Sequence, residues 1–126
     1  MIVGTGTDLA EVPRIAQSVE RFGERFLNRV YTPGECAYAL SKANFAERLA
    51  ARFAAKEAGM KAIGTGWSHG VRWQDFEVIN QPSGKPTLLF HGIARQIANQ
   101  LGASRVHLSL THTKEMALAV VILEAE

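Results

Sequence analysis

NFAERLAARFAAKEAGMKAIG, residues 44–64, is the stretch that decides the fold. Alanine, leucine, methionine and glutamate, all good helix formers, fill more than half of it. Asn44 can cap the start of a helix here, and Gly64 can end it. One face carries apolar residues at helical spacing, namely Phe45, Leu49, Phe53 and Met60. The sequence therefore predicts a long helix over residues 44–63.

The same helix carries charged residues within or beside its packed surface. Lys56 falls inside the apolar stripe and Glu57 at its edge, while alanines cover much of the rest. Charged groups in such packing need partners. In the interpretation that the helix alone favours, Glu57 and Lys61 form an ordinary salt bridge on a solvated face. Arg48, Arg52 and Lys56 form a basic ridge, which is either a second solvated face or a phosphate cradle.

Shorter patterns on either side of this helix complete the predicted fold. Strand-like stretches occupy residues 2–7, 71–79, 87–90, 106–111 and 116–123. Helical patterns fill most of residues 12–63 and break at Gly23 and before Pro33, where Thr32 and Glu35 predict a capping box. A later helix, residues 92–101, has one apolar face, made of Ile93, Ile97 and Leu101. This order predicts an α+β fold with a mainly antiparallel sheet packed against a long central helix.

Length and composition limit the class of protein. The 126 residues suit a single domain over residues 1–126. The net charge of +2 does not indicate nucleic acid binding, and no apolar run reaches membrane-spanning length. The start, MIVGTGTDLAEVPR, lacks the pattern of a signal peptide. One cysteine, Cys36, excludes an internal disulfide and suits a reducing cytoplasm, so we expect a cytoplasmic protein.

Asp8 directly follows the first predicted strand, at a strand end from which a side chain can reach into a cleft. An aspartate there is commonly a cap for the helix that follows. Together with Glu57, Asp8 can instead supply two oxygen ligands to Mg²⁺, which typically takes one or two carboxylates and completes its shell with water and substrate phosphates. Scattered histidines and a single cysteine do not suit zinc.

Two glycine motifs and a histidine each have a structural and a functional interpretation. Gly64-Thr65-Gly66 is a helix end and turn, or a turn that lets a ligand approach the backbone closely. Gly84-Lys85-Pro86 is a hairpin turn first and a ligand contact second. His112 ends an alternating strand, where it is either structural or, when sheltered and charged, a phosphate ligand.

Basic residues also gather near the N-terminus, at Arg14, Arg21 and Arg25. Glutamates are interleaved with them, so a salt-bridged surface is the simpler explanation. If the acids turn away, the arginines can meet an acidic partner and speed its docking.

These elements together resemble the holo-acyl-carrier-protein synthase family. The family's Gly-x-Asp-like element near the start is matched by Gly6-Thr7-Asp8, and its second element by residues 52–62, RFAAKEAGMKA. Three further motifs match in order, namely Gly64-Thr65-Gly66, Gly84-Lys85-Pro86 and Ser109-Leu110-Thr111-His112-Thr113. The resemblance spans almost the whole chain. It departs at Ala43-Asn44, where some members carry basic residues that Lys42 can replace.

The resemblance implies a homotrimer whose active sites lie between neighbouring subunits. Asp8 and Glu57 would bind Mg²⁺ beside the pyrophosphate of coenzyme A, and Lys61 would neutralise part of its charge. Coenzyme A would further contact Arg52, Gly64, Gly84, Lys85, Pro86 and His112, several of them at the adenosine and its 3′-phosphate. An acidic apo acyl carrier protein would face Arg14, Arg21 and Arg25.

The implied reaction moves phosphopantetheine from coenzyme A to a serine of the carrier, releases 3′,5′-ADP and supports fatty acid biosynthesis. Such a transfer needs positioning and charge neutralisation more than covalent catalysis. Glu57 is the candidate base for the serine proton, directly or through a water. Two other classes stay open: a Mg²⁺-dependent nucleotide pyrophosphohydrolase that uses the same carboxylates, and a non-catalytic trimeric ligand-binding module.

Overall fold

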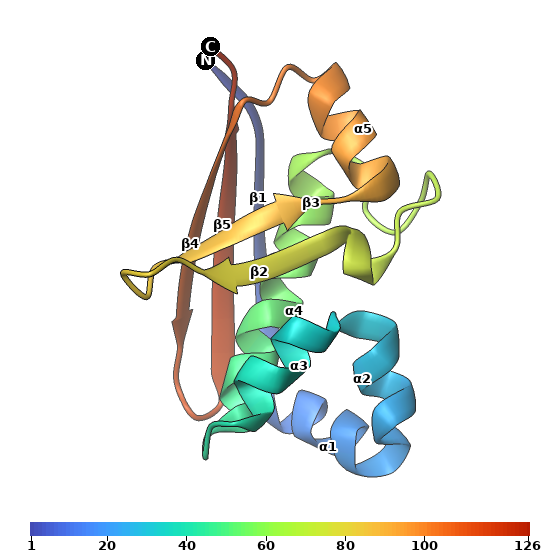
Figure 1. Cartoon of the computed structure of the whole chain (residues 1–126), viewed down its shortest axis with the longest axis vertical. Helices are drawn as coiled ribbons and strands as arrows, with labels where there is room; N and C mark the ends of the chain where they lie inside the picture. The colour runs from blue at the N-terminus through green and yellow to red at the C-terminus, as the bar shows by residue number, and fades with distance from the viewer.

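Two antiparallel sheets and a set of helices make up the computed structural model, which describes all residues 1–126 (Figure 1). In chain order the elements are β1 (Ile2–Glu11), α1 (Val12–Phe22), α2 (Glu24–Val30), α3 (Pro33–Leu40), α4 (Phe45–Ala62), the 3₁₀ helix η1 (Trp73–Asp75), β2 (Phe76–Asn80), β3 (Pro86–Phe90), α5 (Gly92–Gln100), β4 (Arg105–His112) and β5 (Met116–Glu124). The predicted α+β class, the antiparallel pairing and the helix over residues 44–63 are therefore confirmed.

The three-stranded sheet has the order β1-β5-β4, so β1 and β4 form its opposite edges. Helix α4 packs on one face of this sheet, and every other helix lies on the same side (Figure 1). Side chains directly opposite one another on paired strands point to the same face. Asp8, Ala119 and Leu110 form one such row across the three strands. Because Ala119 is fully buried against the helical side, Asp8 and Leu110 also face α4.

Strand β1 lies unusually close to α4, and two glycines allow this. A Cβ atom added at Gly4 would collide with the carbonyl oxygen of Ala62, and one added at Gly6 with that of Ala58. Only glycine fits where two backbones approach so closely. The close approach places the next inward-facing residue of β1, Asp8, beside the C-terminal half of α4.

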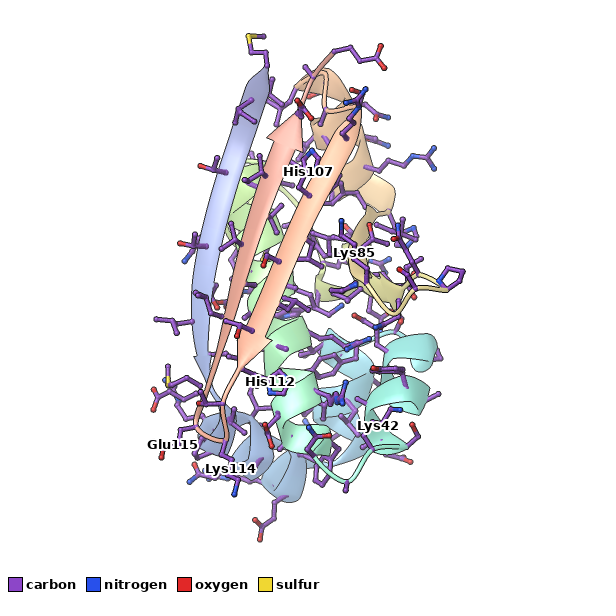
Figure 2. The ribbon with its side chains drawn as sticks, turned by 90° about the vertical axis from the view of Figure 1, so that its left-hand side faces the viewer. Lys42, Lys85, His107, His112, Lys114 and Glu115 are labelled. Atoms are coloured by element: carbon purple, nitrogen blue, oxygen red, sulfur yellow. The ribbon has the colours of Figure 1, made fainter.

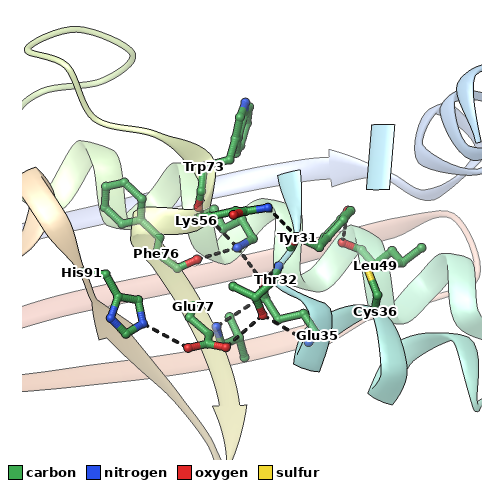
Figure 3. A network of polar contacts seen from close by, with 12 residues as sticks. Tyr31, Thr32, Glu35, Cys36, Leu49, Lys56, Trp73, Phe76, Glu77 and His91 are labelled. Atoms are coloured by element: carbon green, nitrogen blue, oxygen red, sulfur yellow. Dashed lines mark hydrogen bonds and ion pairs between the residues drawn. The ribbon is translucent and has the colours of Figure 1, made fainter. Parts of the chain in front are cut away.

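A buried ion pair anchors the other side of α4 (Figure 3). Lys56 Nζ donates to Glu35 Oε1 at 2.7 Å, to the Trp73 carbonyl at 3.4 Å and to the Phe76 carbonyl. Glu35 in turn accepts from the backbone N–H of Thr32 at 2.9 Å and of Val78 at 3.0 Å. All three donors of the ammonium and both carboxylate oxygens thus have partners. The pair joins α4 to the start of α3 and to β2.

Several local predictions need correction. Asn44 does not cap α4, because its Oδ1 accepts from Arg48 Nε at 3.2 Å and the side chain makes no cap hydrogen bond. The strand predicted from residue 71 begins only at Phe76, after η1. Helix α5 buries Ala94 and Ala98; of its predicted apolar face only Ile97 packs against the core, whereas Ile93 and Leu101 are exposed. The capping box of Thr32 and Glu35 is confirmed.

Candidate active site

Asp8 lies in the middle of β1, not at a strand end as predicted, because β1 continues its pairing with β5 as far as Glu11. Its side chain is only 10% exposed and points toward α4. Oδ1 accepts a hydrogen bond from Lys61 Nζ at 3.2 Å, while the buried Oδ2 has no partner. A helix-cap role is ruled out, since α1 begins with no side-chain cap bond. Asp8 therefore offers one free, desolvated acceptor oxygen beside α4.

Glu57 is half-buried on α4 and shares this environment with Asp8. Burial, followed by the negative charge of nearby Asp8, raises the pKa of Glu57 from 4.5 to about 7. Lys61 opposes the shift only partly. With both carboxylates ionised, the two negative charges repel each other, and either a shared proton or a cation would relieve the repulsion.

Lys61 does not form the salt bridge with Glu57 that the helix alone favoured. Its ammonium group donates instead to the Thr7 carbonyl at 3.0 Å and to Asp8 at 3.2 Å. The side chain stays 55% exposed, so it can also contact a ligand in front of the two carboxylates. Lys61, Asp8 and Glu57 thus form one cluster between β1 and α4, although they come from distant parts of the sequence.

The donor set of this cluster fits Mg²⁺. Asp8 and Glu57 are close enough for their charges to interact, Asp8 Oδ2 lacks any donor, and the chain has no group of three or more His, Cys, Asp or Glu side chains that could hold a metal ion. Mg²⁺ keeps most of its shell for water and phosphate oxygens, and it is commonly bound by one or two carboxylates. Zinc, which prefers nitrogen and sulfur ligands, does not suit these residues.

A cavity of about 300 Å³ adjoins Glu57. It is lined by Leu9, Ala10, Glu11, Arg14, Ile15, Ser18, Phe26, Phe53 and Glu57. A second hollow of about 290 Å³ next to it includes Arg25 and Arg29, and Arg21 lies on the neighbouring surface of α1. Arg14 forms an exposed ion pair with Glu11 at 3.6 Å, while Arg21 and Arg25 have none. The salt-bridged surface that the sequence favoured is therefore wrong for two of the three arginines.

A second group of predicted residues gathers on the β4 side of α4. Arg52 is 5% exposed, and its terminal nitrogen donates to Asn80 Oδ1 at 2.8 Å, while its buried Nε has no partner. Burial lowers the pKa of Arg52. The solvated-face interpretation of the basic ridge is thus wrong for Arg52, and also for the fully buried Lys56.

A cavity of about 190 Å³ lies in front of Arg52. Its lining residues are Tyr38, Arg48, Ala51, Arg52, Asn80, Gly84, Pro86, Leu110 and His112. His112 Nδ1 lies 3.0 Å from Glu47 Oε1, which holds the imidazole at the rim. Lys85 is exposed at the hairpin tip between β2 and β3, outside this lining; Figure 2 shows it and His112 on the β4 side of the sheet.

The two groups lie on opposite sides of α4. Asp8 belongs to β1 and His112 to β4, and β5 separates these edge strands. On α4, Arg48 and Arg52 lie about half a turn round the helix from Glu57 and Lys61. Gly64, in a left-handed conformation with φ of 82°, lies just beyond the end of α4, three residues after Lys61. One chain therefore does not bring the carboxylates and the basic cavity together.

The sequence did not reveal the roles of Tyr38 and Asn80 in the basic cavity. Tyr38 contacts Arg48 and Arg52 across a loop, and no spacing rule connects α3 with α4 in this way. Asn80 precedes the predicted turn at residues 82–86, and its amide holds that turn by donating to the Gly84 carbonyl at 3.0 Å. A polar residue directly before a glycine-rich turn was the available signal for Asn80.

Comparisons with known proteins agree with this geometry. The family model of the 4′-phosphopantetheinyl transferase superfamily matches residues 4–121. The holo-[acyl-carrier-protein] synthase of Solibacter usitatus is 66% identical over 124 residues, which span 98% of this chain and 99% of that protein. The chain therefore belongs to the 4′-phosphopantetheinyl transferase superfamily, and within it to the holo-acyl-carrier-protein synthase family, as the motifs predicted.

Solved structures of the same family share the fold. A holo-(acyl-carrier-protein) synthase from Bacillus anthracis, in complex with CoA (3′,5′-ADP), matches with a TM-score of 0.81 and 38% identity, over 100% of this chain and 99% of that one. The synthase from Neisseria meningitidis matches with a TM-score of 0.87 and 36% identity, over 98% and 99% of the two chains.

Proposed function

We propose that this protein is a Mg²⁺-dependent holo-acyl-carrier-protein synthase, a single domain over residues 1–126. It transfers 4′-phosphopantetheine from coenzyme A to a serine of apo acyl carrier protein and releases 3′,5′-ADP. The names of its relatives and the coenzyme A complex of the Bacillus anthracis protein support this reaction. No helix has the length and apolarity needed to cross a bilayer. A cytoplasmic location and a role in fatty acid biosynthesis are part of the proposal.

One observation carries the proposal. Only three buried side-chain polar atoms lack a hydrogen-bond partner, and two of them are Asp8 Oδ2 and Arg52 Nε. The first is a bare acceptor beside a second carboxylate, and the second is a bare donor in a basic cavity. Leaving a buried polar group unpaired is costly, so such groups call for an explanation. A cation at Asp8 and Glu57, and an anion at Arg52, would satisfy both.

The carboxylate cluster would bind the reacting end of coenzyme A. Mg²⁺ bound by Asp8 and Glu57 would orient the pyrophosphate and stabilise the leaving oxygen. Lys61, exposed beside Asp8, would neutralise further charge on the pyrophosphate. Gly64, without a side chain, would leave room for the ligand next to Lys61. Glu57 would accept the proton of the attacking serine, either directly or through a water.

The basic cavity would bind the other end of the donor. Arg52 and His112 would contact the adenosine and its 3′-phosphate, and Gly84, Lys85 and Pro86 would form the rim at the hairpin. An acidic carrier protein would dock on Arg14, Arg21 and Arg25 beside the cavity at Glu57, where it could present its serine to the cluster.

A homotrimer would complete the site. The carboxylates and the basic cavity lie at opposite edges of one chain, so a donor that touches both must bridge two copies. No helix covers the outer face of the three-stranded sheet (Figure 1). Apolar side chains of β5 point to that face and are only half-buried, namely Met116, Leu118, Val120 and Ile122. An exposed apolar sheet face is typical of a subunit interface.

The intact mass of a purified apo acyl carrier protein tests the proposal. After incubation with this protein, coenzyme A and Mg²⁺, we expect a gain of one phosphopantetheine, which chelator or Asp8→Ala abolishes. Gln96→Ala, an exposed change on α5 away from both clusters and from the outer face of the sheet, serves as a control that keeps the activity. Release of 3′,5′-ADP without any carrier modification would instead identify a hydrolase, and coenzyme A binding without any product would identify a binding module.

A further inference from the structure

Three cations surround one aromatic ring at the mouth of the basic cavity. The charged groups of Arg52, Lys42 and Arg48 lie 4.4 Å, 5.2 Å and 5.8 Å from the ring centroid of Tyr38 on α3. The Tyr38 hydroxyl also accepts a hydrogen bond from an Arg48 terminal nitrogen at 3.0 Å. Cations over an aromatic face are attracted by its quadrupole. Tyr38 therefore holds residues from two segments, the α3–α4 connection and α4, around one point.

No carboxylate neutralises these cations. Lys42, Arg48 and Arg52 make no ion pair. Their polar partners are neutral oxygens: Arg48 donates to Asn44 and to Tyr38, and Arg52 donates to Asn80. Glu47, on the same helix as Arg48 and Arg52, pairs with His112 instead.

This choice of partners has an electrostatic consequence. A carboxylate would fix an arginine just as firmly, but it would also cancel its charge. A ring face and amide or hydroxyl oxygens fix the side chain and leave the charge available to a ligand. A cluster of fixed cations whose positive charges are not neutralised favours a doubly charged anion with several acceptor oxygens, above all a phosphate monoester.

We propose that Tyr38 is a positioning residue that sets the preference of the basic cavity for a phosphate monoester, acting through Arg48 and Arg52. The inference rests on the proposed function, because the monoester is then the 3′-phosphate of coenzyme A. Tyr38 would thereby determine how strongly the protein prefers coenzyme A over dephospho-coenzyme A, which lacks that group. Its ring is half-buried, so the side chain can be replaced without opening the core.

Calorimetric titration of the full-length protein in Mg²⁺, with coenzyme A and with dephospho-coenzyme A, tests this role. For Tyr38→Leu, which removes the ring and the hydroxyl, we expect coenzyme A affinity to fall about tenfold or more, while dephospho-coenzyme A affinity changes less than about twofold. For Tyr38→Phe, which keeps the ring but loses the acceptor for Arg48, we expect a smaller loss of about threefold. The ratio of the two affinities is the decisive readout, because a purely structural defect would lower both.

Phe22→Leu is the matched control, since it removes the one arginine–aromatic stack that does not involve Tyr38, with Arg21 at 5.5 Å, far from the basic cavity. Its affinity ratio should equal that of the wild type. An equal loss of affinity for both donors in Tyr38→Leu would show that the ring only packs against the nucleotide, and it would overturn the inference. A wild-type protein that binds both donors equally would also overturn it. If the wild type prefers coenzyme A but modifies no carrier, the proposed function fails while the role of Tyr38 stands.

Discussion

Helix α4 carries two lysine–carboxylate pairs with opposite properties. Lys56 and Glu35 are both 0% exposed, lie 2.7 Å apart and use all of their remaining donors and acceptors within the protein. Lys61 and Asp8 lie 3.2 Å apart, but Lys61 is 55% exposed and Asp8 keeps one buried oxygen without a partner. The same chemical pair thus occurs once fully satisfied and once unfinished.

Whether all hydrogen-bonding groups of a pair have partners distinguishes a structural pair from a functional one better than its burial or its charge does. A fully satisfied buried pair holds elements together and has nothing left to offer a ligand. An unfinished pair leaves a buried acceptor without a donor, which costs stability, and the like charge of Glu57 adds repulsion. In the proposed function, a cation and a phosphate remove both costs. We therefore expect changes at the first pair to alter stability, and changes at the second to alter ligand binding.

Removing one partner of the satisfied pair should give the largest effect on stability. Lys56→Met leaves the carboxylate of Glu35 buried without its cation, so we expect a loss of about 3–5 kcal/mol in the free energy of unfolding. Denaturant titration followed by circular dichroism measures it. The double variant Glu35→Gln/Lys56→Met removes both charges and should recover most of the loss. If the single variant loses less than about 1 kcal/mol in the free energy of unfolding, the pair contributes no more than an ordinary surface salt bridge, and the prediction is wrong.

Widening the contact between β1 and α4 should affect both stability and the unfinished pair. In Gly6→Ala the new Cβ would collide with the Ala58 carbonyl, so the strand must move, at a cost of about 1–3 kcal/mol. Asp8, two residues further on, moves with it, and we expect weaker Mg²⁺ binding in calorimetry. Gly34→Ala, where a new Cβ would meet nothing closer than 3.9 Å, is the matched glycine control and should lower neither stability nor Mg²⁺ affinity. Unaltered Mg²⁺ affinity in a folded Gly6→Ala protein would contradict this positioning role.

The raised pKa of Glu57 predicts a pH dependence for metal binding. Because the folded, metal-free protein holds a proton that the unfolded chain releases near pH 4.5, its contribution to stability is full below pH 4.5 and is lost as the pH rises through about 7. Mg²⁺ needs the ionised carboxylate, so its apparent affinity should rise about tenfold per pH unit up to about pH 7 and then level off.

Melting temperatures with and without Mg²⁺ between pH 5 and pH 9, about two units on either side of the predicted midpoint, measure this dependence. Without Mg²⁺, Asp8→Asn removes the neighbouring charge, so the midpoint of the change in stability should move to lower pH. A Mg²⁺ effect of constant size across this range would show that no proton competes with the metal.

Lys61→Met should have the smallest effect on stability. Since the ammonium group is mostly exposed, its pair with Asp8 contributes no more than about 1 kcal/mol. Turnover in the carrier-protein mass assay should nevertheless fall, because the charge on the pyrophosphate is no longer neutralised. A large loss of stability with unchanged turnover would show that the Lys61–Asp8 pair is structural, which contradicts the comparison.

The sequence predicted what local rules control. Helical spacing identified α4, and the capping box at Thr32 identified the start of α3. Two motifs of the family resemblance, one with Asp8 and one with Glu57, linked these carboxylates although they lie 49 positions apart, and the structure brings them together. Helical periodicity alone favoured the wrong partner for Lys61, since a residue on β1 competes with one on the same helix.

Contacts between segments that no periodicity links were beyond prediction. Glu35 reaches Lys56 from a separate helix, and Tyr38 reaches Arg52 in the same way. Which residues of α4 face β1 and which face β4 depends on how the helix is rotated on the sheet. That rotation is fixed by the glycines of β1 on one side and by the buried ammonium group of Lys56 on the other.

The separation of the carboxylates and the basic cavity within one chain has a genetic consequence. In the proposed trimer, each chain gives its carboxylates to one site and its basic cavity to the next. A chain inactivated by Asp8→Ala still supplies an intact basic cavity, and one inactivated by Arg52→Ala still supplies intact carboxylates. Two such variants, each inactive alone, should therefore complement each other when they assemble together, because some mixed trimers contain a site built entirely from undamaged halves.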